Sequence, residues 1–204
     1  VVEILEDWLN DRDRPLAVRI RVPRVLRSIG TQRAGEALLF SNPQDDASLR
    51  YRIALAVSGI RLQHPEVRFD RKWALEAVDR RVDSYRYYAR LYEAVARHLP
   101  VHVLVRKVLA QRLGQIIETA FRVLGLIYPH RTMMSIHHRF CYTERENVSD
   151  ALELLDNVIA RECRERLLPL LEGHKALLAT RVEGGRGLEF VEDEMAEPCG
   201  SRDQ

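Results

Sequence analysis

Two segments of this chain are alike at a fixed separation, and that separation restricts the folds open to it. The segment DRPLAVRIRVPRVLRSIG (residues 13–30) aligns with QDDASLRYRIALAVSGIR (residues 44–61) at an offset of 31 residues, which pairs Val18-Arg19-Ile20-Arg21 with Leu49-Arg50-Tyr51-Arg52 and Ile29 with Ile60. Such self-similarity, in units too short to bury their own apolar face, is typical of stacked helical hairpins. The repeat therefore predicts an all-α fold built as an α-solenoid.

Apolar residues recur at helical spacings along the chain, between stretches rich in Gly, Pro and turn-forming residues. The predicted helices cover residues 1–10, 15–29, 31–40, 48–62, 71–99, 101–128, 131–140, 148–159 and 162–178. Pro23 lies inside the second of these and predicts a kink or short break there. Gly30 is expected to end it in a left-handed conformation, while Thr31 and Asp70 are expected to act as N-caps.

Two of the predicted helices are longer than those of a typical repeat. The helix before Pro100 should run about 28 residues, or roughly 42 Å, and the next ends at Pro129. We expect them to form a longer central antiparallel helix pair.

Charge divides the chain into two parts. Residues 181–204 hold three basic and seven acidic side chains, a net charge of −4, so the other residues carry +6 of the total +2. We therefore predict one HEAT-like domain at residues 1–180 and a Gly-rich, acidic, disordered tail at residues 181–204. A net charge of +6 is mildly basic and does not by itself indicate nucleic acid.

Features missing from the sequence lead to expectations about membrane insertion, chain length and cellular compartment. Charged residues interrupt the most apolar region, so we expect no insertion of this segment into a membrane. The start at Val1, already helical in pattern, leads us to expect a piece of a longer chain. Three cysteines without zinc-type spacing favour reduced thiols and a cytoplasmic location, including the cytoplasmic face of a membrane.

Four longer strings carry a family resemblance. They are VPRVLRSIGTQRAGEALL, LRYRIALAVSGIRLQHPEVRFD, FRVLGLIYP and ALELLDNVIARECRERLLPLLE. The similarity covers about residues 13–171 and is weaker at residues 79–102. Together they resemble the HEAT-repeat region of bacterial membrane proteins that carry a domain similar to nucleotide (ADP/ATP) translocases. The segment Arg145–Asp150 and the Gly-rich acidic tail depart from that pattern.

The resemblance implies an architecture and no reaction. In the family that these strings resemble, a transporter-like domain precedes the HEAT repeats and a cyclic-nucleotide-binding domain can follow them. Transport would belong to a domain outside this chain, and the family pattern transfers no catalytic residue. It implies a soluble scaffold with no cofactor.

Three residues are weak candidates for a metal site. His137 and Cys141 have the i, i+4 spacing of helical metal ligands, and His138 adjoins them. No acidic residue within the helix is placed to orient their rings. We therefore predict no metal and an ordinary, partly exposed helix.

The residues from Arg80 to Tyr92 combine cations with aromatic rings, as single-stranded nucleic-acid sites do. Tyr85 and Tyr92, however, fall on the apolar stripe of the predicted helix. We favour core tyrosines with a solvated charged face behind them.

The repeat itself supplies the candidate contact surface. Stacking would align four arginines into two short columns able to bind an acidic peptide or phosphate: Arg19, Arg21, Arg50 and Arg52. The alternative is that their stems pack on the hairpins and their heads pair with Asp11, Asp13, Asp45 or Asp46. That structural alternative is favoured.

No catalytic motif accompanies these features. A Ser/His/Asp order, an H-E-x-x-H motif and a phosphate loop are missing, because the glycines near Arg186 lack the flanking strand and helix. A helical-repeat DNA glycosylase would need an acidic residue in an aromatic-lined pocket, and the sequence nominates none. We predict a non-catalytic scaffold for a protein partner or for neighbouring domains of a longer chain, with a nucleic-acid-binding module as the alternative.

Overall fold

The computed structural model describes residues 1–41, 46–98, 103–142, 145–161, 163–168, 170–171 and 173–174. Every regular element in these ranges is a helix, which confirms the all-α prediction. The predicted acidic tail, the turn residues 42–45 and the helix connection at residues 99–102 lie outside them.

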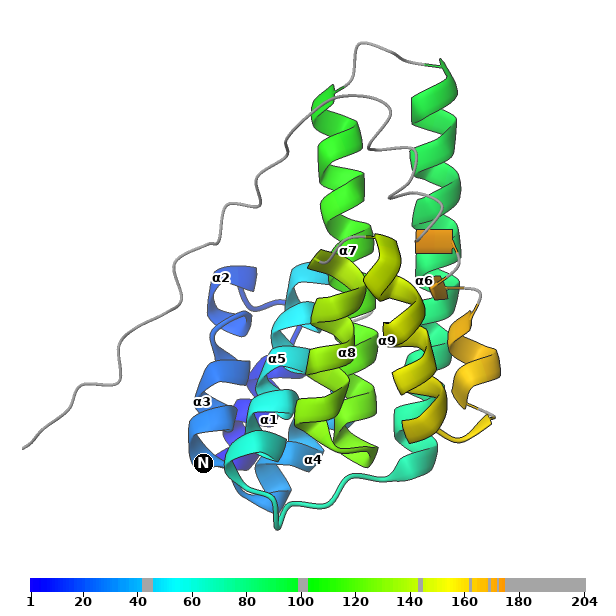
Figure 1. The fold of residues 1–204 in the computed structure, drawn as a ribbon. Coiled ribbons are helices and arrows are strands. Elements are labelled where there is room, and N and C mark those ends of the chain that lie inside the picture. Colours follow the sequence, from blue (N-terminus) through cyan, green and yellow to red (C-terminus); the bar gives the residue numbers. More distant parts are fainter. Residues whose placement is uncertain are drawn as a thin grey trace, which may run out of the picture.

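The N-terminal part consists of five helices that pack closely on one another (Figure 1). They are α1 (Val2–Asn10), α2 (Leu16–Arg19), α3 (Val22–Ile29), α4 (Gln32–Phe40) and α5 (Ala47–Gln63). Helix α3 contacts α1, α4 and α5, so it lies at the centre of this group.

The predicted helix at residues 15–29 is broken into α2 and α3, at Ile20 and Arg21. The prediction of a break near Pro23 is confirmed, but Pro23 lies in the first turn of α3 and not in a helix interior. The first turn tolerates proline because its missing N–H would have no partner within the helix anyway.

Caps named from the sequence are present. The side chains of Thr31 and Asp70 accept hydrogen bonds from Ala34 N at 3.2 Å and Trp73 N at 2.7 Å. Asp46 caps α5 in the same way, through Leu49 N at 2.8 Å. Gly30 ends α3 with φ of 66°, the left-handed conformation predicted for it.

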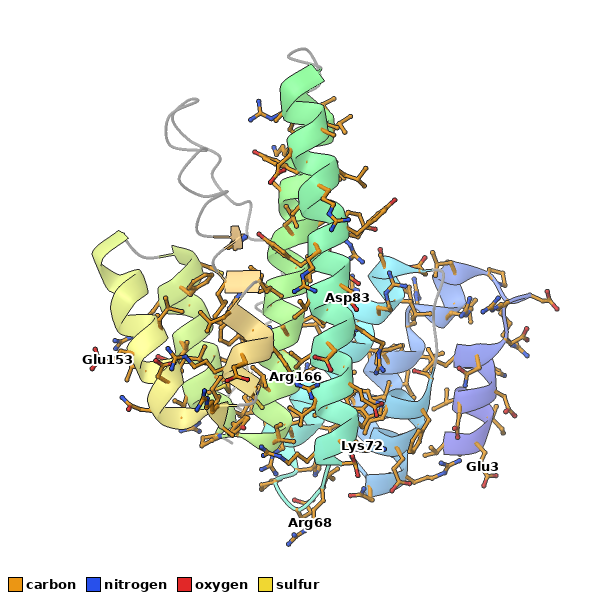
Figure 2. The ribbon with its side chains drawn as sticks, turned by 90° about the vertical axis from the view of Figure 1, so that its right-hand side faces the viewer. Glu3, Arg68, Lys72, Asp83, Glu153 and Arg166 are labelled. Atoms are coloured by element: carbon orange, nitrogen blue, oxygen red, sulfur yellow. The ribbon has the colours of Figure 1, made fainter. Side chains whose placement is uncertain are left out.

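The long central pair is α6 (Arg71–His98) and α7 (Val103–Ile127), which pack along each other. Helix α6 has 28 residues, as its spacing predicted. Helix α7 also contacts α5 and α8, which makes it the central helix of the fold. The outer ends of α6 and α7 stand beyond the other helices as a projecting hairpin (Figures 1 and 2).

The C-terminal helices cover the other side of α7. Helix α8 (His130–Tyr142) contacts α7 and α9 (Arg145–Val158), and further helical residues follow between positions 161 and 174. An ion pair between Arg166 and Asp79 joins this last segment to α6. Both helices extend beyond the predicted bounds of 131–140 and 148–159, because α8 reaches Tyr142 and α9 begins at Arg145, where polar residues carry no apolar periodicity.

Two hydrophobic cores meet at α7. One lies among α1, α3, α4 and α5, and the other lies among α6 to α9 and the segment after them. Trp73 and Ile127 pack against both, so the two cores form one continuous body. Among the described residues, no helix is both long and apolar enough to cross a bilayer.

Candidate functional site

A cleft of about 840 Å³ opens between α5 and α6, two helices that both pack against α7. The C-terminal end of α4 closes one side of it. Its volume falls in the range of roughly 300–1,000 Å³ that is usual for small-molecule sites. The cleft is therefore the strongest candidate site in the part of the chain that the structure describes.

Apolar side chains from all four helices line part of the cleft. Ile53, Ala54 and Val57 come from α5, and Trp73 and Ala77 come from α6; Leu38, Leu39, Phe40, Val123 and Leu126 complete this surface. Ile53, Val57 and Ala77 are at most 8% exposed, so they form the packed back of the cleft. Half-buried Trp73 and exposed Phe40 offer apolar contact to the non-polar part of a ligand.

Arginines give another part of the cleft a positive charge. Arg50 of α5, Arg80 and Arg81 of α6 and Arg122 of α7 all line the cleft, against one carboxylate, Asp83. Asp83 is exposed and lies 3.6 Å from Arg86, a residue that does not line the cleft. The cleft is thus strongly basic.

Among the arginines that line the cleft, Arg81 is partly buried and surrounded by other cations. Burial, and then the positive charges of Arg80, Arg50 and Arg112, lower the pKa of Arg81 to about 10. Within the described ranges it has no carboxylate partner. A half-buried cation among other cations is unfavourable unless an anion joins it.

Arg112 of α7 continues this group of cations behind Arg81. It lines a small adjoining cavity together with Arg50, Arg81 and Ser84. Its Nη1 donates weakly to Ala47 O at 3.4 Å and Gln115 Oε1 at 3.3 Å, while its Nε is buried without a partner among the residues described. None of these contacts supplies a negative charge.

Two tyrosines stand at the outer end of the cleft. Tyr87 and Tyr88 meet edge to face, with ring centroids 5.3 Å apart. The guanidinium carbon of Arg112 lies 5.4 Å from the centroid of Tyr88, close enough for a cation–π contact. Tyr87 is exposed, so its ring remains accessible to a ligand.

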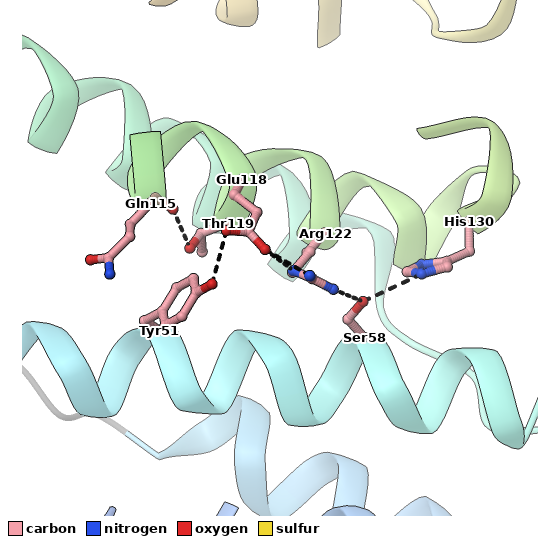
Figure 3. A network of polar contacts seen from close by, with 7 residues as sticks. All are labelled: Tyr51, Ser58, Gln115, Glu118, Thr119, Arg122 and His130. Atoms are coloured by element: carbon pink, nitrogen blue, oxygen red, sulfur yellow. Dashed lines mark hydrogen bonds and ion pairs between the residues drawn. The ribbon is translucent and has the colours of Figure 1, made fainter. Parts of the chain in front are cut away.

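A polar network joins α5 to α7 beside the cleft (Figure 3). Tyr51 donates to Glu118 Oε2 at 2.9 Å, and Arg122 donates to Glu118 Oε1 through Nε at 2.9 Å and Nη2 at 2.6 Å. Arg122 Nη1 then approaches Ser58 Oγ at 3.4 Å, which lies 3.5 Å from His130 Nε2. The charge of Arg122, unlike that of Arg81, is therefore matched by a described carboxylate.

The Ser58–His130 pair does not form a catalytic nucleophile. Ser58 is only 2% exposed, so a substrate cannot reach its hydroxyl. Burial, followed by the charges of Arg122 and Arg61, lowers the pKa of His130. The network instead serves to lock α5 onto α7.

The four arginines predicted from the repeat occupy different surroundings. Arg19 donates from Nε to Leu9 O at 3.1 Å, and Arg21 is exposed at the break between α2 and α3. Arg50 lies half-buried in the cleft, whereas Arg52 is exposed on α5. Of the four, only Arg50 lines the candidate site.

The three residues considered as metal ligands, His137, His138 and Cys141, also lie in different surroundings. His137 is buried and its ring packs on Phe121, with centroids 5.5 Å apart, while the adjacent His138 is exposed. Burial raises the pKa of Cys141 to about 12, which disfavours the thiolate that a metal needs. In the described part of the chain, no three His, Cys, Asp or Glu side chains are grouped to hold a metal.

The arginine- and tyrosine-rich stretch of α6 is divided in two. Tyr85 and Tyr92 are core residues, as the apolar stripe predicted. Arg80, Arg81, Tyr87 and Tyr88 line the cleft. Arg112 and Arg122 could not be named as site residues from the sequence, because nothing in the pattern of α7 shows which neighbour its polar positions face.

Comparison of the chain with protein-family models, with curated proteins and with solved structures gives no match.

Proposed function

We propose that this chain is a non-catalytic scaffold of HEAT-like helical hairpins that binds a protein partner or a neighbouring domain of a longer chain. The observation that carries this proposal is the projecting hairpin of α6 and α7, which exposes Leu104 by 77% and Val108 by 63%. Large apolar side chains exposed at the end of a helix pair are typical of an interaction surface. Leu91 of α6 and Val105 of α7 are exposed as well.

The charges on these outer ends indicate the chemistry of the partner. Arg90, Arg106 and Lys107 lie there against one described carboxylate, Glu93. A partner that offers an apolar patch with an acidic rim would match both features. The alignment at an offset of 31 residues and the resemblance to HEAT repeats support a solenoid of this kind, as the soluble part of a membrane-associated, transporter-like protein at the cytoplasmic face.

Site-specific crosslinking in cells tests the proposal. A photo-crosslinking amino acid is placed at Val108 or, as a control, at Leu62, an exposed residue at the C-terminal end of α5. We expect Val108 to give a defined product, identified by mass spectrometry, that Leu104→Glu abolishes. Equal yields from the two positions would overturn the proposal.

A nucleic-acid-binding module is the second candidate, favoured by the basic cleft with Tyr87 and Tyr88 at its outer end. Oligonucleotide affinity should then fall steeply as salt rises, because bound counterions are released. Affinity that is absent, or insensitive to salt, would remove this candidate.

A further inference from the structure

Three arginines from three helices gather where the cleft adjoins the small cavity behind it. Arg50 of α5 and Arg81 of α6 line both the cleft and the small cavity behind it, and Arg112 of α7 lines that cavity. The fields of Arg50 and Arg112 both act on Arg81. These cations therefore lie close together although they are up to 62 positions apart in sequence.

The described carboxylates of this region are engaged with other groups. Asp83, the carboxylate in the cleft lining, lies 3.6 Å from Arg86. Glu118 is already bonded to Arg122 and Tyr51. Asp79 pairs with Arg166, and Asp46 caps α5. Glu76 approaches Arg80 only at 4.0 Å. Gathering cations in a partly desolvated place is costly in free energy, and an anion from outside would offset that cost.

The number of cations indicates the type of anion. A carboxylate carries one charge, whereas a phosphate ester or a diphosphate carries about two or more at neutral pH. Guanidinium groups match phosphate oxygens with pairs of hydrogen bonds, which is why arginine is favoured at phosphate sites.

The remainder of the cleft suits the rest of such a ligand. Tyr87 and Tyr88 line the cleft next to these cations: the guanidinium carbon of Arg112 lies 5.4 Å from the centroid of Tyr88, and the ring of Tyr87 is exposed. We propose that this cleft binds a small phosphate ester, with its phosphate among Arg50, Arg81 and Arg112 and its aromatic or apolar group against Tyr87 and Tyr88. The site lies apart from Leu104 and Val108, so this proposal and the proposed scaffold function can fail independently.

Calorimetric titration of the whole chain tests the site with four probes: pyrophosphate, phenyl phosphate, succinate and a ten-nucleotide oligothymidine. We expect binding of the two phosphates, with succinate weaker by about tenfold or more because it lacks the phosphate charge and geometry. Equal binding of succinate would identify a carboxylate site and overturn the proposal. Tight, salt-sensitive binding of the oligonucleotide alone would assign the cleft to nucleic acid and overturn it as well.

Matched variants locate the binding. Arg81→Gln should weaken phenyl phosphate by about tenfold or more, and Arg81→Lys should recover part of the loss since it restores charge without the planar fork. Arg24→Gln, at an exposed position of α3 outside the cleft, is the control and should leave affinity unchanged within about twofold. If Arg81→Gln does not fold, Arg112→Gln gives the same test from α7. Wild-type affinity in a folded Arg81→Gln or Arg112→Gln variant would refute the assignment.

Discussion

Tyr51 of α5 donates its phenol proton to Glu118 of α7 across 2.9 Å, and this bond ties the N-terminal helices to the central helix of the fold. The same carboxylate holds Arg122, so one partly buried charge organises two contacts. The bond lies beside the cleft, whose shape depends on α5 and α6 both being held against α7.

Tyr51→Phe should lower the free energy of unfolding by about 1.5 kcal/mol, because it removes a hydrogen bond to a charged group. Urea denaturation followed by circular dichroism measures this change. The matched control is Tyr87→Phe at an exposed tyrosine, which should change stability by less than about 0.5 kcal/mol. Equal losses from the two variants would show that the Tyr51–Glu118 bond does not stabilise the fold.

Gly30 and Gly114 should respond to alanine with opposite signs. Gly30 has φ of 66°, and a Cβ there would lie 2.1 Å from His64 Nε2. Gly30→Ala should therefore cost about 2 kcal/mol of unfolding free energy. Gly114 lies inside α7, and a Cβ at this position would have nothing within 4 Å, so Gly114→Ala should stabilise the protein by about 0.5–1 kcal/mol. Thermal and urea melts of both variants give the signs, and destabilisation by both would contradict this prediction.

Replacement of Arg122, which pairs with Glu118, and of Arg81, which has no carboxylate partner among the described residues, should change stability differently. Arg122→Gln leaves Glu118 partly buried without its cation, and should cost about 1–2 kcal/mol after allowance for the 21% exposure of the Glu118 side chain. Arg81→Gln removes a cation from among other cations, so the melting temperature of the ligand-free protein should stay the same or rise. A large loss from Arg81→Gln would mean that its guanidinium stabilises the free fold.

Stability should fall on acidification partly through His137. Burial lowers the pKa of His137 to about 4 from the ordinary 6.5, so between these values the unfolded chain binds a proton that the folded one excludes. Unfolding free energy should thus be fully retained above about pH 6.5 and lost as pH falls toward 4, with a slope of up to about 1.4 kcal/mol per pH unit from this group.

Urea denaturation at pH 7, 6 and 5 measures that slope, to which the half-buried His130 also contributes. His137→Gln should reduce it, whereas the control His138→Gln, at the adjacent exposed position, should not. Identical slopes in the two variants would exclude His137 as a source of the pH dependence.

Local features of the fold could be predicted because they depend on neighbours in sequence. The caps at Thr31 and Asp70, the left-handed Gly30 and the length of α6 all follow from short-range chemistry or from apolar spacing. The break before Pro23 was placed a few residues late, since proline also fits the first turn of a helix.

The candidate site could be predicted only in fragments. The repeat points to Arg50, and the sequence of α6 groups Arg80 and Arg81 on one helix. Nothing in the periodicity of α7 indicated that Arg112 faces Arg81 while Arg122 turns to Glu118. Those choices depend on which helices become neighbours.

The amino-acid sequence alone determined that this chain is helical, where most of its helices begin and end, and which tyrosines of α6 enter the core. Those properties follow from backbone propensity and from the burial of one face of each helix. Only the tertiary structure decided that α5 and α6 share α7 and leave a cleft between them. It alone brought Arg50, Arg81 and Arg112 together, because packing among distant segments, and not local spacing, sets which charges meet.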